Sequence, residues 1–223
     1  MAYTPTVWKN GEFPPIDAEH LNKIEQGIAN SAPGGFGLGG SIVYAPSNSD
    51  GLSDANLIDA TGFYLAAANV TGGGWNYVFH MQYPSDDALQ FGSFVNDTTY
   101  KFRKKISGVW QPWEWVNPPM ELGVEYRTTE RYLGKPVYAK AVDCGQIADG
   151  KEVEHGIDNM LYCIFAQGLR GGMPMPVIFN HNLSDPWSCY ISHVTSTKVR
   201  FECGTSAAGG NCAVLFKYIK TTD

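Results

Sequence analysis

One loop of the chain groups the kinds of side chain that bind sugars. Sugar sites combine aromatic rings with planar polar groups that bond to hydroxyls. Around a Ser-Asp-Pro turn the sequence supplies both kinds: Asn180, His181, Asn182, Asp185, Trp187 and Tyr190. Arg170, in GLRGG, is a further candidate at a loop tip. We predict these residues as the binding set, with the alternative that the Trp after the turn proline fills a core.

Carboxylates are the other groups with catalytic potential. A glycan hydrolase needs two carboxyl groups about 5–9.5 Å apart. Glu152 and Glu154 share one face of KEVEHG if it is extended, which places them roughly 7 Å apart. The sequence indicates no substrate groove beside them, so a solvated pair is the better interpretation. The hydrolase motifs G-x-S-x-G and H-E-x-x-H are absent. We therefore expect no enzyme, no catalytic residue and no cofactor.

The histidines and cysteines form no metal motif. The five histidines make no H-x-H or H-x-x-x-H pair, so no metal site is predicted. In a trimer, His181 or His193 repeated around a three-fold axis would still offer three imidazoles. The cysteines are odd in number and show no C-x-x-C spacing, which favours buried thiols made in a reducing cytoplasm.

Composition narrows the class of protein. The 223 residues carry a net charge of −6, which argues against nucleic-acid binding. No apolar run approaches the ~18 residues of a membrane span, and MAYTPTVWKN is unlike a signal peptide. We expect neither nucleic-acid partners nor membrane insertion. Charged residues are only 17%, which hints that surface is buried between subunits.

An aromatic hairpin over residues 98–116 is the strongest element of the pattern. Alternation places Tyr100 and Phe102 on one face and Lys101 and Arg103 on the other, with Ser107-Gly108 as the turn. We interpret its cations as a solvated strand edge, with contact to an anionic polymer as the alternative. In the earlier strand WNYVFHM we expect four side chains to point inward: Trp75, Tyr77, Phe79 and Met81.

The remaining pattern predicts a mainly β protein with one short helix. Strand-like segments separated by Gly, Pro and Asn turns recur through the last hundred residues and predict a sandwich or jelly-roll-like tip. Near the start, Leu21, Ile24 and Ile28 form one apolar stripe after Asp17 at a helix N-cap. We predict a trimerising helix bundle, with packing on the chain's own β domain as the alternative.

Two stretches resemble known phage proteins. Gly62-Phe63-Tyr64, the glycine turn at 72–74, WNYVFHM, Gln90, and Arg103 before WQPWEW resemble the pyocin-knob domain of phage tail fibres and tail-like bacteriocins, over about residues 50–117. TVWKNGEFPPIDAEHLNKIEQGI resembles the N-terminal part of tail-fibre and baseplate proteins of phages of Gram-positive bacteria. Any small β-sandwich with a Trp-rich core is the alternative to the first resemblance.

Together these patterns predict three domains. Residues 1–40 form a tail-attachment segment with the helix and a Gly-rich linker, residues 41–119 a knob-like β domain, and residues 120–223 a β-sandwich tip. The resemblance implies a receptor-binding fibre or tip protein of the virion tail, and the helix stripe and low charge lead us to expect a homotrimer. It would assemble in the bacterial cytoplasm, join tail or baseplate proteins through its N-terminus, and bind a host glycan or wall polymer. The alternatives are an adaptor that binds only tail proteins and, less favoured, a glycan depolymerase.

Overall fold

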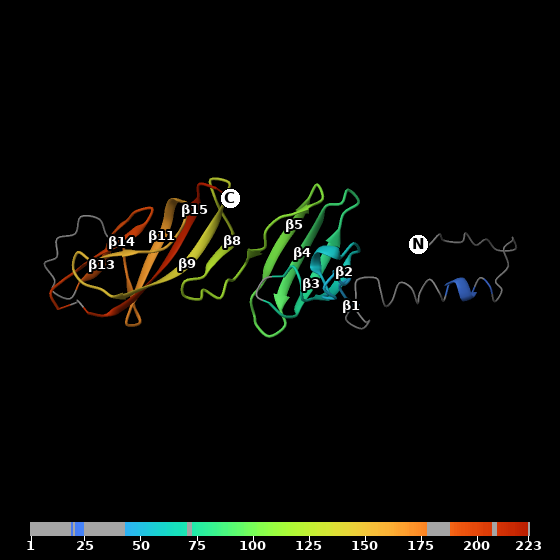
Figure 1. Cartoon of the computed structure of the whole chain (residues 1–223), viewed down its shortest axis with the longest axis horizontal. Helices are drawn as coiled ribbons and strands as arrows, with labels where there is room; N and C mark the ends of the chain where they lie inside the picture. Colours follow the sequence, from blue (N-terminus) through green and yellow to red (C-terminus); the bar gives the residue numbers. More distant parts are fainter. Residues whose placement is uncertain are drawn as a thin grey trace, which may run out of the picture. The chain divides into compact units, whose positions relative to one another are not determined.

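The computed structural model of the chain describes residues 19, 21–24, 43–70, 73–177, 188–206 and 209–222 (Figure 1). It is mainly β, with helical residues near the N-terminus, as predicted. Within the described residues no helix is long and apolar enough to cross a membrane. The chain forms two compact units. Met1–Thr98 with Phe102–Pro112 make the first, and Thr99–Lys101 with Trp113–Asp223 the second. The predicted boundaries at residues 40 and 119 stay predictions.

The first unit is built on one sheet with strand order β1-β2-β3-β4-β5. The strands are β1 (Val43–Tyr44), β2 (Gly62–Ala66), β3 (Asn76–Gln82), β4 (Ala88–Phe94) and β5 (Lys101–Ile106), with a 3-10 turn, η1 (Ala55–Leu57), before β2. The short β6 (Val109–Trp110) pairs with β5. Ser107 and Gly108 connect these two strands with φ of 50° and 80°. Two positive φ values suit a two-residue hairpin turn, so the predicted hairpin and its turn are confirmed.

The inner face of this sheet is the opposite of the one predicted. Asn76, Val78 and His80 of β3 are fully buried, whereas Trp75 and Tyr77 are 44% and 49% exposed. The expectation that the aromatic residues of WNYVFHM point inward is therefore wrong for this unit. The physical reason is that His80 is hydrogen-bonded on both ring nitrogens and Asn76 Nδ2 donates to Gly74 O, which removes much of the cost of placing them inside. Asn76 Oδ1 has no partner among the described residues.

The predicted solvated edge is wrong for two cations of β5, whereas Lys104 of the same strand is exposed. Lys101 and Arg103 are only 2% and 5% exposed, so they do not form a solvated edge. Within the first unit, the Arg103 guanidinium carbon lies 4.1 Å from the Trp110 ring centroid. Within the second, the Lys101 ammonium lies 5.4 Å from the Trp115 ring centroid. A cation over an indole face is attracted by the ring quadrupole, which helps to offset the cost of burial.

The second unit is a two-layer β-sandwich. Its larger sheet has the order β7-β8-β9-β15-β11-β12 and its smaller sheet the order β10-β14-β13. The strands are β7 (Glu114–Trp115), β8 (Glu125–Tyr132), β9 (Lys135–Gln146), β10 (Glu152–Glu154), β11 (Met160–Arg170), β12 (Met173–Met175), β13 (Cys189–Val194), β14 (Lys198–Cys203) and β15 (Asn211–Lys220). Buried residues of both sheets form one core: Val142, Ile191, Val199, Phe201, Val214 and Phe216. Sandwich packing of this end, expected from the turn pattern, is confirmed.

Two of the cysteines depart from the expected free thiols. Cys189 and Cys203 are directly paired across β13 and β14, with their Cα atoms 4.2 Å apart, and form a disulfide. Cys144, Cys163 and Cys212 are free. Burial raises the pKa of the Cys144 thiol to about 12, so this group stays protonated and unreactive at neutral pH. The disulfide closes the hairpin of the smaller sheet.

Candidate recognition surface

Only two of the predicted receptor-binding residues lie in the described part of the chain. Arg170 ends β11, is half-buried, and its Nε has no hydrogen-bond partner among the described residues. Tyr190 of β13 is 2% exposed, and its hydroxyl donates to Glu202 Oε2 at 2.9 Å. Asn180, His181, Asn182, Asp185 and Trp187 lie outside the described residues, so the assignment of this set to binding stays a prediction.

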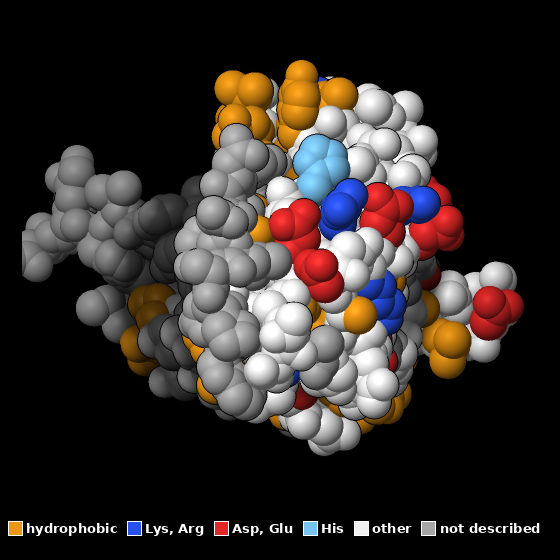
Figure 2. Space-filling model, turned by 90° about the vertical axis from the view of Figure 1, so that its left-hand side faces the viewer, with side chains coloured by type: hydrophobic (Ala, Val, Ile, Leu, Met, Phe, Trp, Pro, Cys, Tyr) orange, Lys and Arg blue, Asp and Glu red, His pale blue; other side chains and the backbone are white. Residues whose placement is uncertain are grey.

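The outer face of the smaller sheet carries a set of charged groups that sequence reasoning did not bring together, although it named Glu152, Glu154 and His193 separately. We call it the charged face, and it consists of Glu152, Glu154, His193, Lys198, Arg200 and Glu202. Figure 2 shows side chains of both charges gathered beside a histidine on this side of the molecule. The alternation of Lys198, Arg200 and Glu202 with buried Val199 and Phe201 was the available signal.

Strand pairing brings these groups together from distant parts of the sequence. Arg200 of β14 lies between Glu152 of β10 and His193 of β13, because it pairs with both. Lys198 Nζ lies 3.2 Å from Glu152 Oε2, and Arg200 Nε lies 3.6 Å from Glu202 Oε1. Exposed ion pairs of this kind contribute little to stability. Their donors and acceptors can therefore exchange partners with a ligand at low cost.

The charged face rests on a rigid support. The inward side chains of β14, Val199 and Phe201, are fully buried in the core shared with β15. Beside them, His155 is buried and bonded on both ring nitrogens. Its Nδ1 accepts from Ile157 N, and its Nε2 donates to Thr195 O at 3.2 Å. Burial lowers the pKa of His155, so the ring is held neutral by this arrangement.

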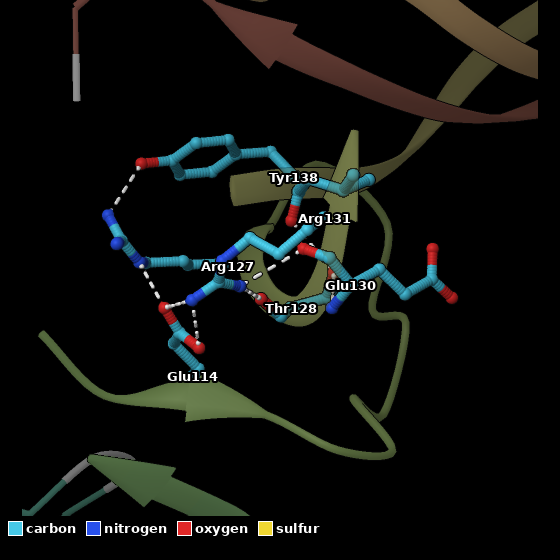
Figure 3. Close-up of polar contacts among 7 residues, drawn as sticks. Glu114, Arg127, Thr128, Glu130, Arg131 and Tyr138 are labelled. Atoms are coloured by element: carbon cyan, nitrogen blue, oxygen red, sulfur yellow. Dashed lines mark hydrogen bonds and ion pairs between the residues drawn. The ribbon is translucent and has the colours of Figure 1, made fainter. Parts of the chain in front are cut away.

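A second polar cluster joins β7 to β8 and β9 (Figure 3). Glu114 Oε1 accepts from Arg127 Nε at 3.0 Å and from Arg131 Nη2 at 2.6 Å, and Arg127 Nη1 also donates to Tyr138 Oη at 3.2 Å. The nearby carboxylate of Glu130 points away from Glu114 in this view and pairs with Lys217. Because the Glu114 carboxylate is occupied by its arginines, we interpret the cluster as a structural clamp.

A third polar cluster lies inside the first unit. Gln90 Oε1 accepts from Arg103 Nε at 2.9 Å and from Arg103 Nη2 at 2.7 Å. The Gln90 amide donates to Ala55 O at 2.7 Å and to His80 Nδ1 at 3.0 Å, while His80 Nε2 donates to Gln82. Burial lowers the pKa of Arg103 to about 10 and also lowers that of His80. The arginine thus stays charged at neutral pH and the histidine neutral.

The described residues give no metal centre. No group of three His, Cys, Asp or Glu side chains within them is placed to hold a metal ion. His193 lies on the charged face, and His181 lies outside the described residues, so a site repeated around a three-fold axis is not tested. Glu152 and Glu154 are both exposed, and Glu152 pairs with Lys198.

Comparison with known proteins gives no family. No family model and no curated protein matches the sequence. Among solved structures, an N-truncated R2-type pyocin tail fibre shares 13% identity at a TM-score of 0.26, covering 79% of this chain and 99% of that one. A C-terminal part of the R1 pyocin fibre of P. aeruginosa shares 11% at 0.32, covering 86% and 69%. The corresponding part of the R2 fibre of P. aeruginosa shares 12% at 0.27, covering 80% and 68%. The chain is similar to these pyocin fibres at a level too low to assign it to their family.

Proposed function

We propose that this chain is a non-enzymatic receptor-binding component of a phage tail fibre or of a tail-like particle. It would work as a homotrimer at the host surface and bind a glycan or wall polymer there. The observation that carries this proposal is the charged face, an exposed set of planar donors and acceptors on a rigid sheet. The resemblance of the knob-like and N-terminal segments to tail-fibre proteins supports the same role.

The chemistry of the charged face suits a ligand rich in hydroxyl groups. Arg200 offers guanidinium donors, Glu152 and Glu154 offer carboxylate acceptors, and His193 offers a ring that does both. A hydroxyl bonds well to a donor and an acceptor at once, which neighbouring groups of opposite charge provide. Three linked copies of a weak site can raise avidity by roughly 10² to 10⁴ without new contacts.

The N-terminal segment would join the particle. Of the apolar helix stripe, Leu21 is 50% exposed and Ile24 is half-buried, while Ile28 lies outside the described residues. An exposed Leu on a short helix fits packing against other copies or against tail or baseplate proteins. The protein would be assembled in the bacterial cytoplasm and act outside the cell as part of the virion tail.

Binding of the labelled full chain to Gram-positive cells and to purified walls tests the proposal. The double variant Lys198→Ala/Arg200→Ala removes the cations of the charged face and should lower binding at least tenfold. Lys135→Ala/Lys217→Ala removes the same charge elsewhere in the second unit and should leave binding unchanged. Equal binding by both variants would contradict the assignment of this face.

Two further outcomes separate the alternatives. If the chain decorates no cell but captures a tail or baseplate protein, the adaptor is the better assignment. Release of reducing sugar from purified wall or capsule would instead show a glycan hydrolase, and replacing Glu152 and Glu154 would then be the next step.

A further inference from the structure

The outer face of the first unit's sheet carries a row of partly exposed phenylalanines. Phe63 of β2 pairs with Phe79 of β3, and Phe79 pairs with Phe91 of β4. The ring centroids of Phe91 and Phe102 of β5 lie 5.9 Å apart. Four phenylalanines therefore cross four neighbouring strands in one row, flanked on β3 by Tyr77. We call this row, with its two β3 neighbours, the phenylalanine face: Phe63, Tyr77, Phe79, Met81, Phe91 and Phe102.

The face leaves more apolar area in water than scattered surface side chains do. Phe63, Tyr77, Met81 and Phe91 are each between 43% and 49% exposed. Since a large aromatic side chain has about 150–250 Å² to bury, the three aromatic residues alone expose on the order of 300 Å², and Met81 adds to this. A stable interface buries about 800 Å² on each partner. These four side chains therefore supply somewhat less than half of the area that one partner buries in a stable interface, before the half-buried Phe79 and Phe102 are counted.

The chemistry of the face favours an identical chain over a sugar. The outward positions of β3 and β4 carry no charged side chain, while β5 places the exposed Lys104 on the same side. Two copies that meet over β3 and β4 would therefore not repel one another, with Lys104 beside the contact. A sugar platform needs polar groups beside its rings. Here the rings meet one another, with Phe63 and Phe79 at 4.8 Å, and the Ser93 hydroxyl donates to its neighbour's carbonyl.

We propose that the phenylalanine face is the main surface through which copies of this chain associate. Three such flat apolar faces can meet around a three-fold axis and remove one another from water. The short N-terminal helix is marginal by itself, so it would add to this contact and not replace it. The inference rests on the homotrimer of the proposed function, and it assigns that contact to the knob-like unit.

Light scattering on the full chain tests this surface. The wild type should have the mass of three chains. The double variant Phe63→Gln/Phe91→Gln should have the mass of one chain at the same concentration, with an unchanged circular dichroism spectrum, because both side chains point away from the core. Leu133→Gln, which changes a 78% exposed leucine in the second unit, is the matched control and should keep the mass of three chains.

Each outcome decides a separate statement. A three-chain mass that survives the double variant would overturn the phenylalanine face and leave the homotrimer standing. A single-chain mass for the wild type would overturn both, while host binding is judged by the cell assay alone. If the double variant loses its spectrum, the single variants are compared by dilution. Each should dissociate at a concentration at least tenfold higher than the wild type, and no change would overturn the inference.

Discussion

Replacement of Gln90 by Leu tests the polar network that takes the place of an apolar inner face in the first unit. Leu is similar in size but makes none of the four hydrogen bonds that the Gln90 side chain makes to Arg103, Ala55 and His80. Hydrogen bonds to charged groups contribute about 1.5–3 kcal/mol each, and the two from one guanidinium are not independent. We therefore expect a loss of about 3–5 kcal/mol, the range for breaking a buried charged contact.

Urea unfolding followed by tryptophan fluorescence measures this loss, since Trp110 stacks on Arg103. With a slope of about 2 kcal/mol per M, the midpoint should fall by about 2 M. Gln90→Leu/Arg103→Met is the decisive comparison, because it also removes Arg103 Nε and Nη2, the two buried donors that lose Gln90 Oε1 in the single variant. The double variant should be more stable than Gln90→Leu alone. A single-variant loss below about 1 kcal/mol, or a double variant no more stable, would refute the reasoning.

Three other predictions concern pH, a carboxylate and the disulfide. Burial lowers the folded-state pKa of His80 and of His155. As the pH falls through 6.5, these histidines bind protons in the unfolded chain before they do so in the folded chain, and the folded state loses stability. Calorimetry should show a melting temperature that is highest above that pH and falls below it, and a flat profile would contradict this. Glu114→Gln should lower the free energy of urea unfolding by about 2 kcal/mol. The loss is no larger because Arg131, the more exposed of the two arginine partners, is screened by solvent. Reduction of the Cys189–Cys203 bond should cost about 3 kcal/mol, seen as a lower melting temperature with reductant, because the bond closes a loop of 14 residues.

The strands and turns of this chain could be predicted from its sequence. Period-two alternation located β3 and β5, and the Ser107-Gly108 pair located the turn, because positive φ at two adjacent positions is a local property of the chain. The sandwich of the second unit followed from regularly spaced strands and turns in the same way. Sequence patterns therefore predicted the strands and turns, because these are determined by interactions between residues close together in the sequence.

The two sides of the first sheet could not be assigned in this way. Alternation divides β3 into two sets of side chains but does not say which set is buried. Hydrophobicity selected Tyr77 and Phe79, whereas the structure buries Asn76 and His80. That choice depends on partners far away in the sequence, such as Gln90 for His80, which supply the missing hydrogen bonds.

The candidate surface was missed for a related reason. Lys198 and Arg200 were visible as alternating charges on a predicted strand, but their neighbours Glu152 and His193 come from other strands. Only the register of the smaller sheet brings the four together. The loop chosen from composition lies mostly outside the described residues, so its role remains a prediction.

The exposed phenylalanines of this sheet have an explanation in the proposed assembly, whereas its buried arginine is explained within the unit. Inside the unit, Arg103 is stabilised by Gln90 and Trp110, so its burial requires no partner from another chain. The rings of Phe63 and Phe91 contact Phe79 and Phe102 but keep nearly half of their surface in water. Their free energy is recovered only when another surface removes them from water. In the proposed assembly such a sheet would be completed by association, and a hydrophobicity rule for solitary domains would then assign its sides the wrong way round.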